Sequence, residues 1–126
     1  MKPPVSTFVK YHGLGNDFVV LDLRADNQDI NAQLSQRLCD RHFGIGADGV
    51  LTILKTSSGL DQMVVHNADG SIAEMCGNGL RCVVKHLAEQ TSERPRVLRV
   101  ATGTGGHGLS QCELVLSARR VRQERE

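Results

Sequence analysis

The order of apolar and polar residues along this chain predicts short strands. Apolar or alternating runs occur at residues 7–11, 17–23, 50–54, 62–66, 72–75, 96–101 and 109–116. Residues 18–21 are continuously apolar, which is typical of a strand buried on both faces. An Asp-Gly pair at Asp69 and Gly70 predicts a tight turn that pairs the fourth run with the fifth.

A first helix is expected at residues 31–41. Asn31 is the expected N-cap, and Gly44 is expected to end the helix. Leu34 and Leu38 lie four residues apart, so they share one face of this helix.

A second helix is predicted by the wide apolar stripe of Leu80, Val83, Val84, Leu87 and Ala88. Asn78 is the expected N-cap. Cys76 then lies just before the first turn, where unpaired N–H groups and the helix dipole favour a thiolate and lower the thiol pKa. From physical chemistry alone, a reactive thiol and an inert cysteine both remain open at Cys76.

Together these elements predict an α+β fold. We expect a curved, mostly antiparallel sheet or barrel wrapped around a central helix that starts just after Cys76. Residues 1–117 are expected to form this domain, and residues 118–126 to be a polar tail or a truncated linker to a missing second domain.

Composition narrows the function further. The 126 residues are 40% apolar and 23% charged with a net charge of +1, which gives no reason to expect nucleic acid or a membrane surface as partner. The partner is expected to be a small molecule. The chain has no apolar run of roughly 18 residues, which a membrane span needs, and its four cysteines lack metal-site spacing. A cytoplasmic protein with free thiols and no metal is expected.

Several local motifs carry weaker signals. Residues 44–49 match G-x-G-x-x-G, but a helix precedes the motif and a strand follows it, which disfavours nucleotide binding. Asn16 lies among glycines, where it can serve a turn or a ligand. His66 is the histidine nearest Cys76 in sequence, so a Cys–His hydrolase is an alternative. Buried structural roles are expected for Cys39, Cys82 and Cys112.

Three segments in order resemble diaminopimelate epimerases: KYHGLGNDF at residues 10–18, RHFGIGADG at residues 41–49, and NADGS continuing to MCGNGLRC within residues 67–82. That family inverts LL- to meso-diaminopimelate without pyridoxal phosphate or another cofactor, in lysine and peptidoglycan precursor synthesis. Its members have two similar halves, each with one catalytic cysteine. The resemblance implies that Cys76 is catalytic and that the substrate contacts are Asn16, Asn67, Gly77 and Asn78.

The resemblance also implies what this chain lacks. The second half, with its own cysteine, is not among these residues, so the chain is expected to be inactive alone unless two copies pair. The intact protein is expected to be a homodimer. Some relatives carry Gln at the position of Gly49, which leaves a substrate contact there open. Two alternatives remain: a racemase for another amino acid, although proline-racemase-like proteins have His at the position of Asn78, and a non-catalytic half that binds an amino acid.

Overall fold

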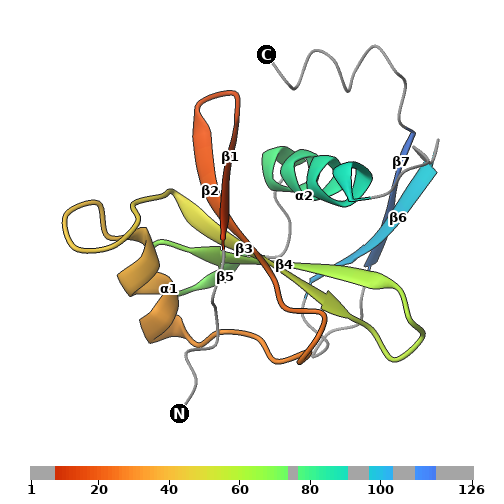
Figure 1. Cartoon of the computed structure of the whole chain (residues 1–126), viewed down its shortest axis with the longest axis horizontal. Coiled ribbons are helices and arrows are strands. Elements are labelled where there is room, and N and C mark those ends of the chain that lie inside the picture. The colour runs from red at the N-terminus through yellow and green to blue at the C-terminus, as the bar shows by residue number, and fades with distance from the viewer. Residues whose placement is uncertain (1–7, 74–76, 91–96, 104–109, 116–126) are drawn as a thin grey trace.

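Seven strands form one mixed sheet in this computed structural model, which describes residues 8–73, 77–90, 97–103 and 110–115. The strands are β1 (Val9–Gly13), β2 (Asn16–Asp22), β3 (Gly49–Lys55), β4 (Asp61–Asn67), β5 (Ile72–Ala73), β6 (Val97–Thr102) and β7 (Ser110–Val115). The helices are α1 (Ala32–Cys39) and α2 (Gly77–Glu89). The spatial order is β1-β2-β3-β4-β6-β7, and β5 pairs with β4 (Figure 1).

The predicted strands are confirmed, with small shifts at their ends. The mostly antiparallel arrangement is also confirmed, because only the β2–β3 and β4–β6 pairs are parallel. The barrel alternative is wrong for the described residues. A barrel requires its first and last strands to pair, whereas β1 and β7 are the two edges of an open sheet.

The central strands β2, β3 and β4 are buried on both faces, as the continuous apolar run in β2 predicts. Phe18 and Val20 belong to the apolar cluster under α2, whereas Val19 and Leu21 belong to the cluster under α1. This division follows from the two-residue period of a strand, which sends successive side chains to opposite faces. The two helices therefore cover opposite faces of the same strands (Figure 1).

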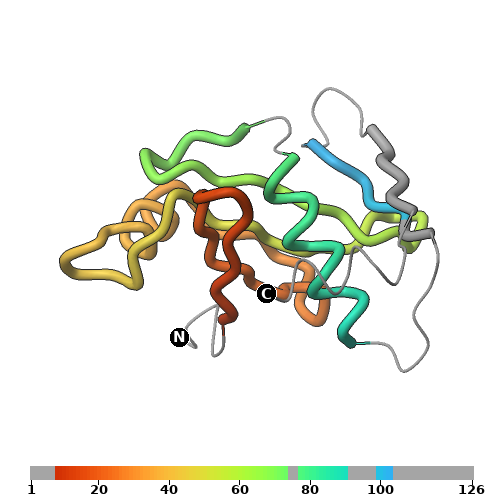
Figure 2. Tube along the Cα trace, turned by 90° about the horizontal axis from the view of Figure 1, so that it is seen from above, coloured from red at the N-terminus to blue at the C-terminus, as the bar shows by residue number. Residues whose placement is uncertain are grey.

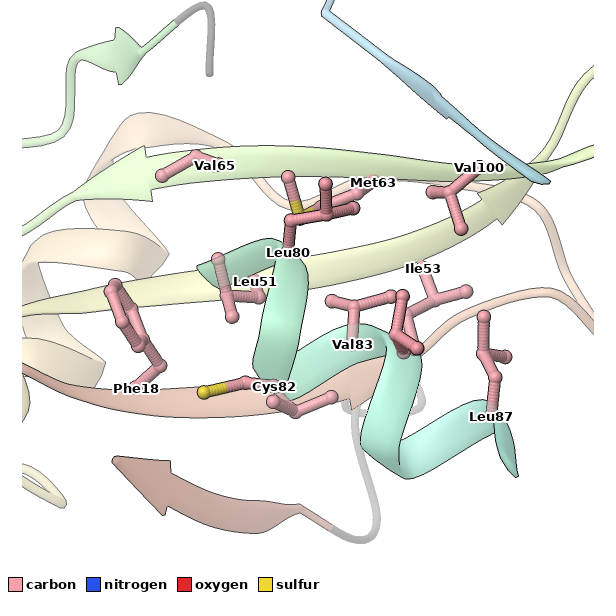
Figure 3. Packing of buried hydrophobic residues seen from close by; sticks show 12 residues of the cluster. Phe18, Leu51, Ile53, Met63, Val65, Leu80, Cys82, Val83, Leu87 and Val100 are labelled. Atoms are coloured by element: carbon pink, nitrogen blue, oxygen red, sulfur yellow. The ribbon is translucent and has the colours of Figure 1, made fainter. Parts of the chain in front are cut away.

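The apolar stripe of α2 lies against the sheet. All five residues of that stripe are buried, and Cys82 is buried beside them. Figure 3 shows Leu80, Val83 and Leu87 pointing from the helix toward side chains of β3, β4 and β6. Seen from above, α2 crosses the sheet beside the β1–β2 hairpin (Figure 2). The predicted central helix is therefore confirmed.

The start of α1 follows the prediction, whereas its end does not. The Asn31 side chain accepts a hydrogen bond of 2.8 Å from the Leu34 amide, as an N-cap does. The helix ends at Cys39, well before Gly44, because Asp40 is extended and its carboxylate accepts the amides of residues 42 and 43. Gly44 instead closes the following turn, where its amide donates to the Asp40 carbonyl.

Some expectations concern residues outside the described ranges. These are the placement of Cys76, the end of the fifth strand at residues 74–75, and the tail or linker at residues 118–126. The burial of the Cys112 side chain is likewise not described. Within the described residues, neither helix has the length and apolar character that crossing a membrane requires.

Candidate functional site

The first residue of α2 is exposed, whereas Gly79 and Leu80 in the same turn are buried. Gly77 is exposed and is the first residue of the helix, directly after Cys76 in the sequence. A Cβ built on Gly77 would meet no described atom within 4 Å. Asn78 is half-buried and lies inside the first turn, so its prediction as the N-cap is wrong by one or more positions. The first amides of a helix have no partner within the helix and lie at its positive end, which favours a negatively charged group.

The β1–β2 hairpin brings Asn16 to the same place. Gly13 and Asn16 pair across a turn in which Leu14 and Gly15 have φ of 52° and 90°. Two successive positive φ values are typical of the type I′ turns that join tightly paired strands. A Cβ on Gly13 would lie only 3.7 Å from the Asn78 carbonyl oxygen. The hairpin therefore packs on the first turn of α2, and the exposed Asn16 lies beside it.

Asn67 ends β4 opposite the first residue of β3, Gly49. Its side-chain amide donates to Ser71 Oγ over 3.0 Å, and its backbone amide donates to the Ser71 carbonyl over 2.7 Å. Asn67 therefore also holds the predicted Asp-Gly turn, in which Gly70 has a φ of 93°. Its carbonyl accepts the Ser35 hydroxyl of α1 over 2.9 Å, which fixes the end of the strand.

Topology explains why these residues gather. The parallel strands β2 and β3 begin at one end of the sheet, the antiparallel β1 and β4 end there, and α2 begins beside the β1–β2 turn. We call this the Gly77 end, defined by Gly13, Asn16, Gly49, Asn67 and Gly77. The structure thus brings the predicted residues Asn16, Asn67, Gly77 and Asn78 to the same end of the molecule.

Sequence reasoning missed a charged cluster at the Gly77 end. Arg41 lies between the carboxylates of Asp17 and Asp48, with contacts of 2.8 and 3.0 Å from its Nη2 atom. Lys10 Nζ donates to Asp17 over 2.8 Å. These residues come from two segments, and Arg41 lies 24 residues from Asp17 in the sequence, so no local pattern marked the cluster. The motif strings of residues 10–18 and 41–49, which contain all of them, were the available signal.

His66 faces away from α2. It lies in the face of β4 toward α1, because the neighbouring Val65 points into the cluster under α2. Only 2% of His66 is exposed, its Nε2 is 3.0 Å from both carboxylate oxygens of Asp29, and the Thr52 hydroxyl is 3.5 Å away. Burial opposes ionisation of Asp29, yet the hydrogen bond and charge of His66 leave its pKa lowered overall. This histidine is already engaged on the face opposite α2, which disfavours the Cys–His hydrolase.

Cys39 and Cys82 fit the buried structural roles that the sequence predicts. Cys39 and Cys82 are each 4% exposed and carry free thiols. Burial raises the pKa of the Cys39 thiol, so its reactive thiolate form is scarce. Among the described residues no cluster of His, Cys, Asp and Glu side chains could hold a metal ion. The glycine pattern at residues 44–49 follows α1 and ends on Gly49, the first residue of β3, so it leads into a strand and not into a helix.

A cavity lies at the opposite end of the sheet. It has a volume of about 500 Å³ and is lined in part by Phe8, Asp22, Arg24 and His86. We call this the Gln90 end, after the residue that follows α2 and also lines the cavity. The polar groups here bond to each other: Arg24 Nη2 donates to Asp22 and to Gln90, each over 2.6 Å. The cavity is therefore separate from the predicted site residues.

Solved structures define the class of fold. A phenazine biosynthesis protein of the PhzF family from Enterococcus faecalis matches with a TM-score of 0.60 and 11% identity, covering 88% of this chain and 40% of that chain. One from Bacillus anthracis matches with a TM-score of 0.58 and 17% identity, covering 89% and 36%. At such identities the likeness shows the α+β fold alone.

Sequence relatives identify the family within that fold. The model of the family described as Diaminopimelate epimerase matches residues 8–113. The diaminopimelate epimerase of Synechocystis is 48% identical over 101 residues, covering 79% of this chain and 36% of the relative. That of Clostridium perfringens is 46% identical over 99 residues, covering 78% and 36%. The chain belongs to the diaminopimelate epimerase family, and it spans little more than a third of the length of these relatives.

Proposed function

We propose that the intact protein interconverts LL- and meso-diaminopimelate without pyridoxal phosphate, and that this chain supplies one of its two catalytic thiols, Cys76. The observation that supports the proposal is that Asn16, Asn67 and Asn78 lie at the same end of the molecule as the start of α2, whose first residue follows Cys76 in the sequence. Family membership and the names of the relatives support the same reaction.

The proposed chemistry is a proton exchange at the α-carbon. Inversion needs a base on one face of that carbon and an acid on the other. A thiolate and a thiol suit this task, because the reverse reaction only exchanges their roles. The amides of Gly77 and Asn78 lie at the positive end of α2 and are suited to hold the α-carboxylate as charge builds on it. Loss of one such donor typically raises a barrier by about 3 kcal/mol.

The second thiol is proposed to come from the part of the intact protein that this chain does not span. The first test is to incubate this chain alone with LL-diaminopimelate and follow meso product by chromatography, with the intact Synechocystis relative as positive control. We expect no product from the chain. Product formation would refute the requirement for a second half and would favour pairing of two copies.

The second test measures the reactivity of Cys76. Iodoacetamide labelling of the native chain, followed by peptide mass spectrometry, is expected to modify Cys76 well before Cys39 and Cys82. The start of a helix favours the thiolate at Cys76, whereas the other two thiols are buried. Unfolded protein, in which all thiols are exposed, is the control. Equal labelling of the three cysteines in the native chain would remove the argument for a thiolate at the start of α2.

The same site could serve a different amino acid or only bind one. Calorimetry with diaminopimelate, together with hydrogen isotope exchange at its α-carbon, separates binding from chemistry. Exchange by the intact protein with diaminopimelate supports the proposal, whereas binding without exchange supports a non-catalytic half. A cytoplasmic location, a homodimer, and a place in lysine and peptidoglycan precursor synthesis belong to this proposal and are carried by the family resemblance alone.

A further inference from the structure

The parallel strands β2 and β3 are joined beyond the end of their regular ladder. The ladder begins with Phe18 opposite Gly49. One residue earlier, the Asp48 amide donates to the Asp17 carbonyl over 2.9 Å and to Asp17 Oδ1 over 3.1 Å. The Asp17 amide donates in return to Asp48 Oδ2 over 3.1 Å. We call this reciprocal pair of residues the aspartate clasp.

Two carboxylates held this close repel each other unless cations lie between them. Arg41 supplies one cation: its Nη1 and Nη2 atoms reach the two Asp17 oxygens over 3.1 and 2.8 Å, and Nη2 also reaches Asp48 over 3.0 Å. A planar guanidinium can bridge two carboxylates in this way. The hydrogen bond from Arg41, followed by that from Lys10, holds the pKa of Asp17 well below its ordinary value.

The clasp sits directly beside a predicted substrate contact. Asn16 precedes Asp17 in the chain and pairs with Gly13 on β1, which is an edge strand. The clasp ties the residue after Asn16 to the interior strand β3. The position of Asn16 beside the first turn of α2 therefore depends on the hairpin pair on one side and on the clasp on the other.

From this arrangement we propose that Arg41 is a positioning residue, which fixes Asn16 for substrate by holding the starts of β2 and β3 together. The inference rests on the proposed function, in which Asn16 contacts the substrate. Arg41 does not touch the substrate in this account, and it acts through Asp17 and Asp48.

The exposure of Arg41 separates a positioning role from a purely structural one. Its side chain is 56% exposed, and exposed ion pairs contribute little to global stability. A variant without Arg41 should therefore stay folded while the clasp loosens. Arg37 offers a matched control, because it is an exposed arginine on α1 and its removal changes the net charge equally.

The first arm of the test uses this chain and needs no substrate. Amide hydrogen exchange by NMR is measured for Asp17 and Asp48 in wild type, Arg41→Ala, Arg41→Lys and Arg37→Ala. We expect exchange of both amides to speed up about tenfold in Arg41→Ala, since local opening governs their protection. Arg41→Lys should give a smaller change, and Arg37→Ala none. Unchanged exchange in Arg41→Ala would overturn the inference.

The second arm measures diaminopimelate turnover by the intact protein. Because a misplaced binding group weakens ground state and transition state alike, we expect Arg41→Ala to raise KM about tenfold and to change kcat less than about twofold. Arg41→Lys should recover part of the KM, and Arg37→Ala should match wild type. Faster exchange with an unchanged KM would overturn the role toward substrate.

The amide-exchange and turnover experiments distinguish failure of the proposed function from failure of the proposed role of Arg41. If the wild-type intact protein does not turn over diaminopimelate, the proposed function fails, and the exchange data still decide whether Arg41 closes the clasp. If Arg41→Ala does not fold, Asp48→Asn replaces it, because Asn keeps an oxygen for the Asp17 amide and loses the ion pair. Faster exchange at Asp17 in that variant supports the inference, and wild-type exchange contradicts it.

Discussion

An aspartate–arginine ion pair lies at each end of β2, and the two arginines contact different parts of the molecule. At the Gly77 end, Asp17 pairs with Arg41, and at the Gln90 end Asp22 pairs with Arg24. The side chain of Arg41 is 56% exposed, whereas that of Arg24 is 25% exposed. Arg41 lies in the loop after α1 and connects it to the starts of β2 and β3. Arg24 also donates to Gln90, so it links the sheet to the end of α2.

This difference explains how α2 can be held by contacts at its C-terminal end while Gly77 at its N-terminal end stays exposed. α2 is fixed by its buried stripe and by the polar contacts at the Gln90 end, including the 3.3 Å contact between the Tyr11 hydroxyl and His86 Nδ1. At its first turn the neighbouring residue on the hairpin is the small Gly13, and a Cβ there would lie 3.7 Å from the Asn78 carbonyl oxygen. Burial of Tyr11, aided by Glu89, raises the pKa of its phenol to about 12. The cavity of about 500 Å³ lies at the Gln90 end, whereas the predicted site residues lie at the Gly77 end.

The strongest way to disturb the Gly77 end is to enlarge Gly49. A Cβ there would lie 2.9 Å from the His66 carbonyl oxygen, and the Phe18 ring is 3.5 Å away. Backbone atoms of β4 would have to move, so Gly49→Gln is expected to lower the free energy of unfolding by about 3 kcal/mol, as overpacked cores do. Urea denaturation measures this change.

Gly77→Ala is the matched control for stability, because the space around Gly77 is open and alanine favours a helix. Its free energy of unfolding should equal or exceed that of wild type. If Gly49→Gln is as stable as wild type, the strands can separate here, and the Gln found in some relatives would fit this chain without adjustment elsewhere.

The contrast between the ends also shows what could be predicted from the sequence. The spacing of apolar residues predicted the strands and the buried face of α2, because each buried position requires an apolar side chain whatever its partner is. The parallel pairing of β2 with β3 left no local trace. The contacts of Arg41 and Arg24 span up to 66 residues of sequence, as between Arg24 and Gln90, so they emerge only when the fold is assembled. The early end of α1 was missed because the Asp40 carboxylate competes with the helix for backbone amides.

The next largest effect should come from removing the arginine at each end. Arg24→Ala leaves the partly buried Asp22 without its main partner and is expected to cost about 1–2 kcal/mol of unfolding free energy. Arg41→Ala should cost less than about 1 kcal/mol, because its ion pairs are exposed. Urea denaturation of both variants tests the ranking. Equal losses of unfolding free energy would mean that the two arginines contribute equally to stability, which would contradict the ranking.

The pH dependence of stability should also report on the Asp22–Arg24 ion pair, because acid protonates the Asp22 carboxylate. The hydrogen bond from Arg24 lowers the pKa of Asp22 in the folded protein. The stability that this carboxylate provides is therefore complete above the ordinary Asp pKa, near about 4, and is lost as the pH falls toward its folded value. Wild type should lose unfolding free energy between about pH 5 and pH 3, and Arg24→Ala should lose less over that range. Parallel pH curves would contradict the assignment.

The smallest effect belongs to His86 at the Gln90 end. Its Nδ1 faces the Tyr11 hydroxyl, its Nε2 is 3.1 Å from Gln90 Nε2, and Asp22 lies 4.0 Å away. Burial lowers the pKa of His86, so the unfolded chain takes up a proton first as the pH falls through about 6.5. Wild type should therefore lose less than about 1 kcal/mol between pH 7.5 and the folded pKa, and His86→Gln should lose less than wild type. Should His86→Gln show the same pH dependence as wild type, the imidazole is not held neutral, and the end of α2 is fastened by Arg24 and Gln90 without its help.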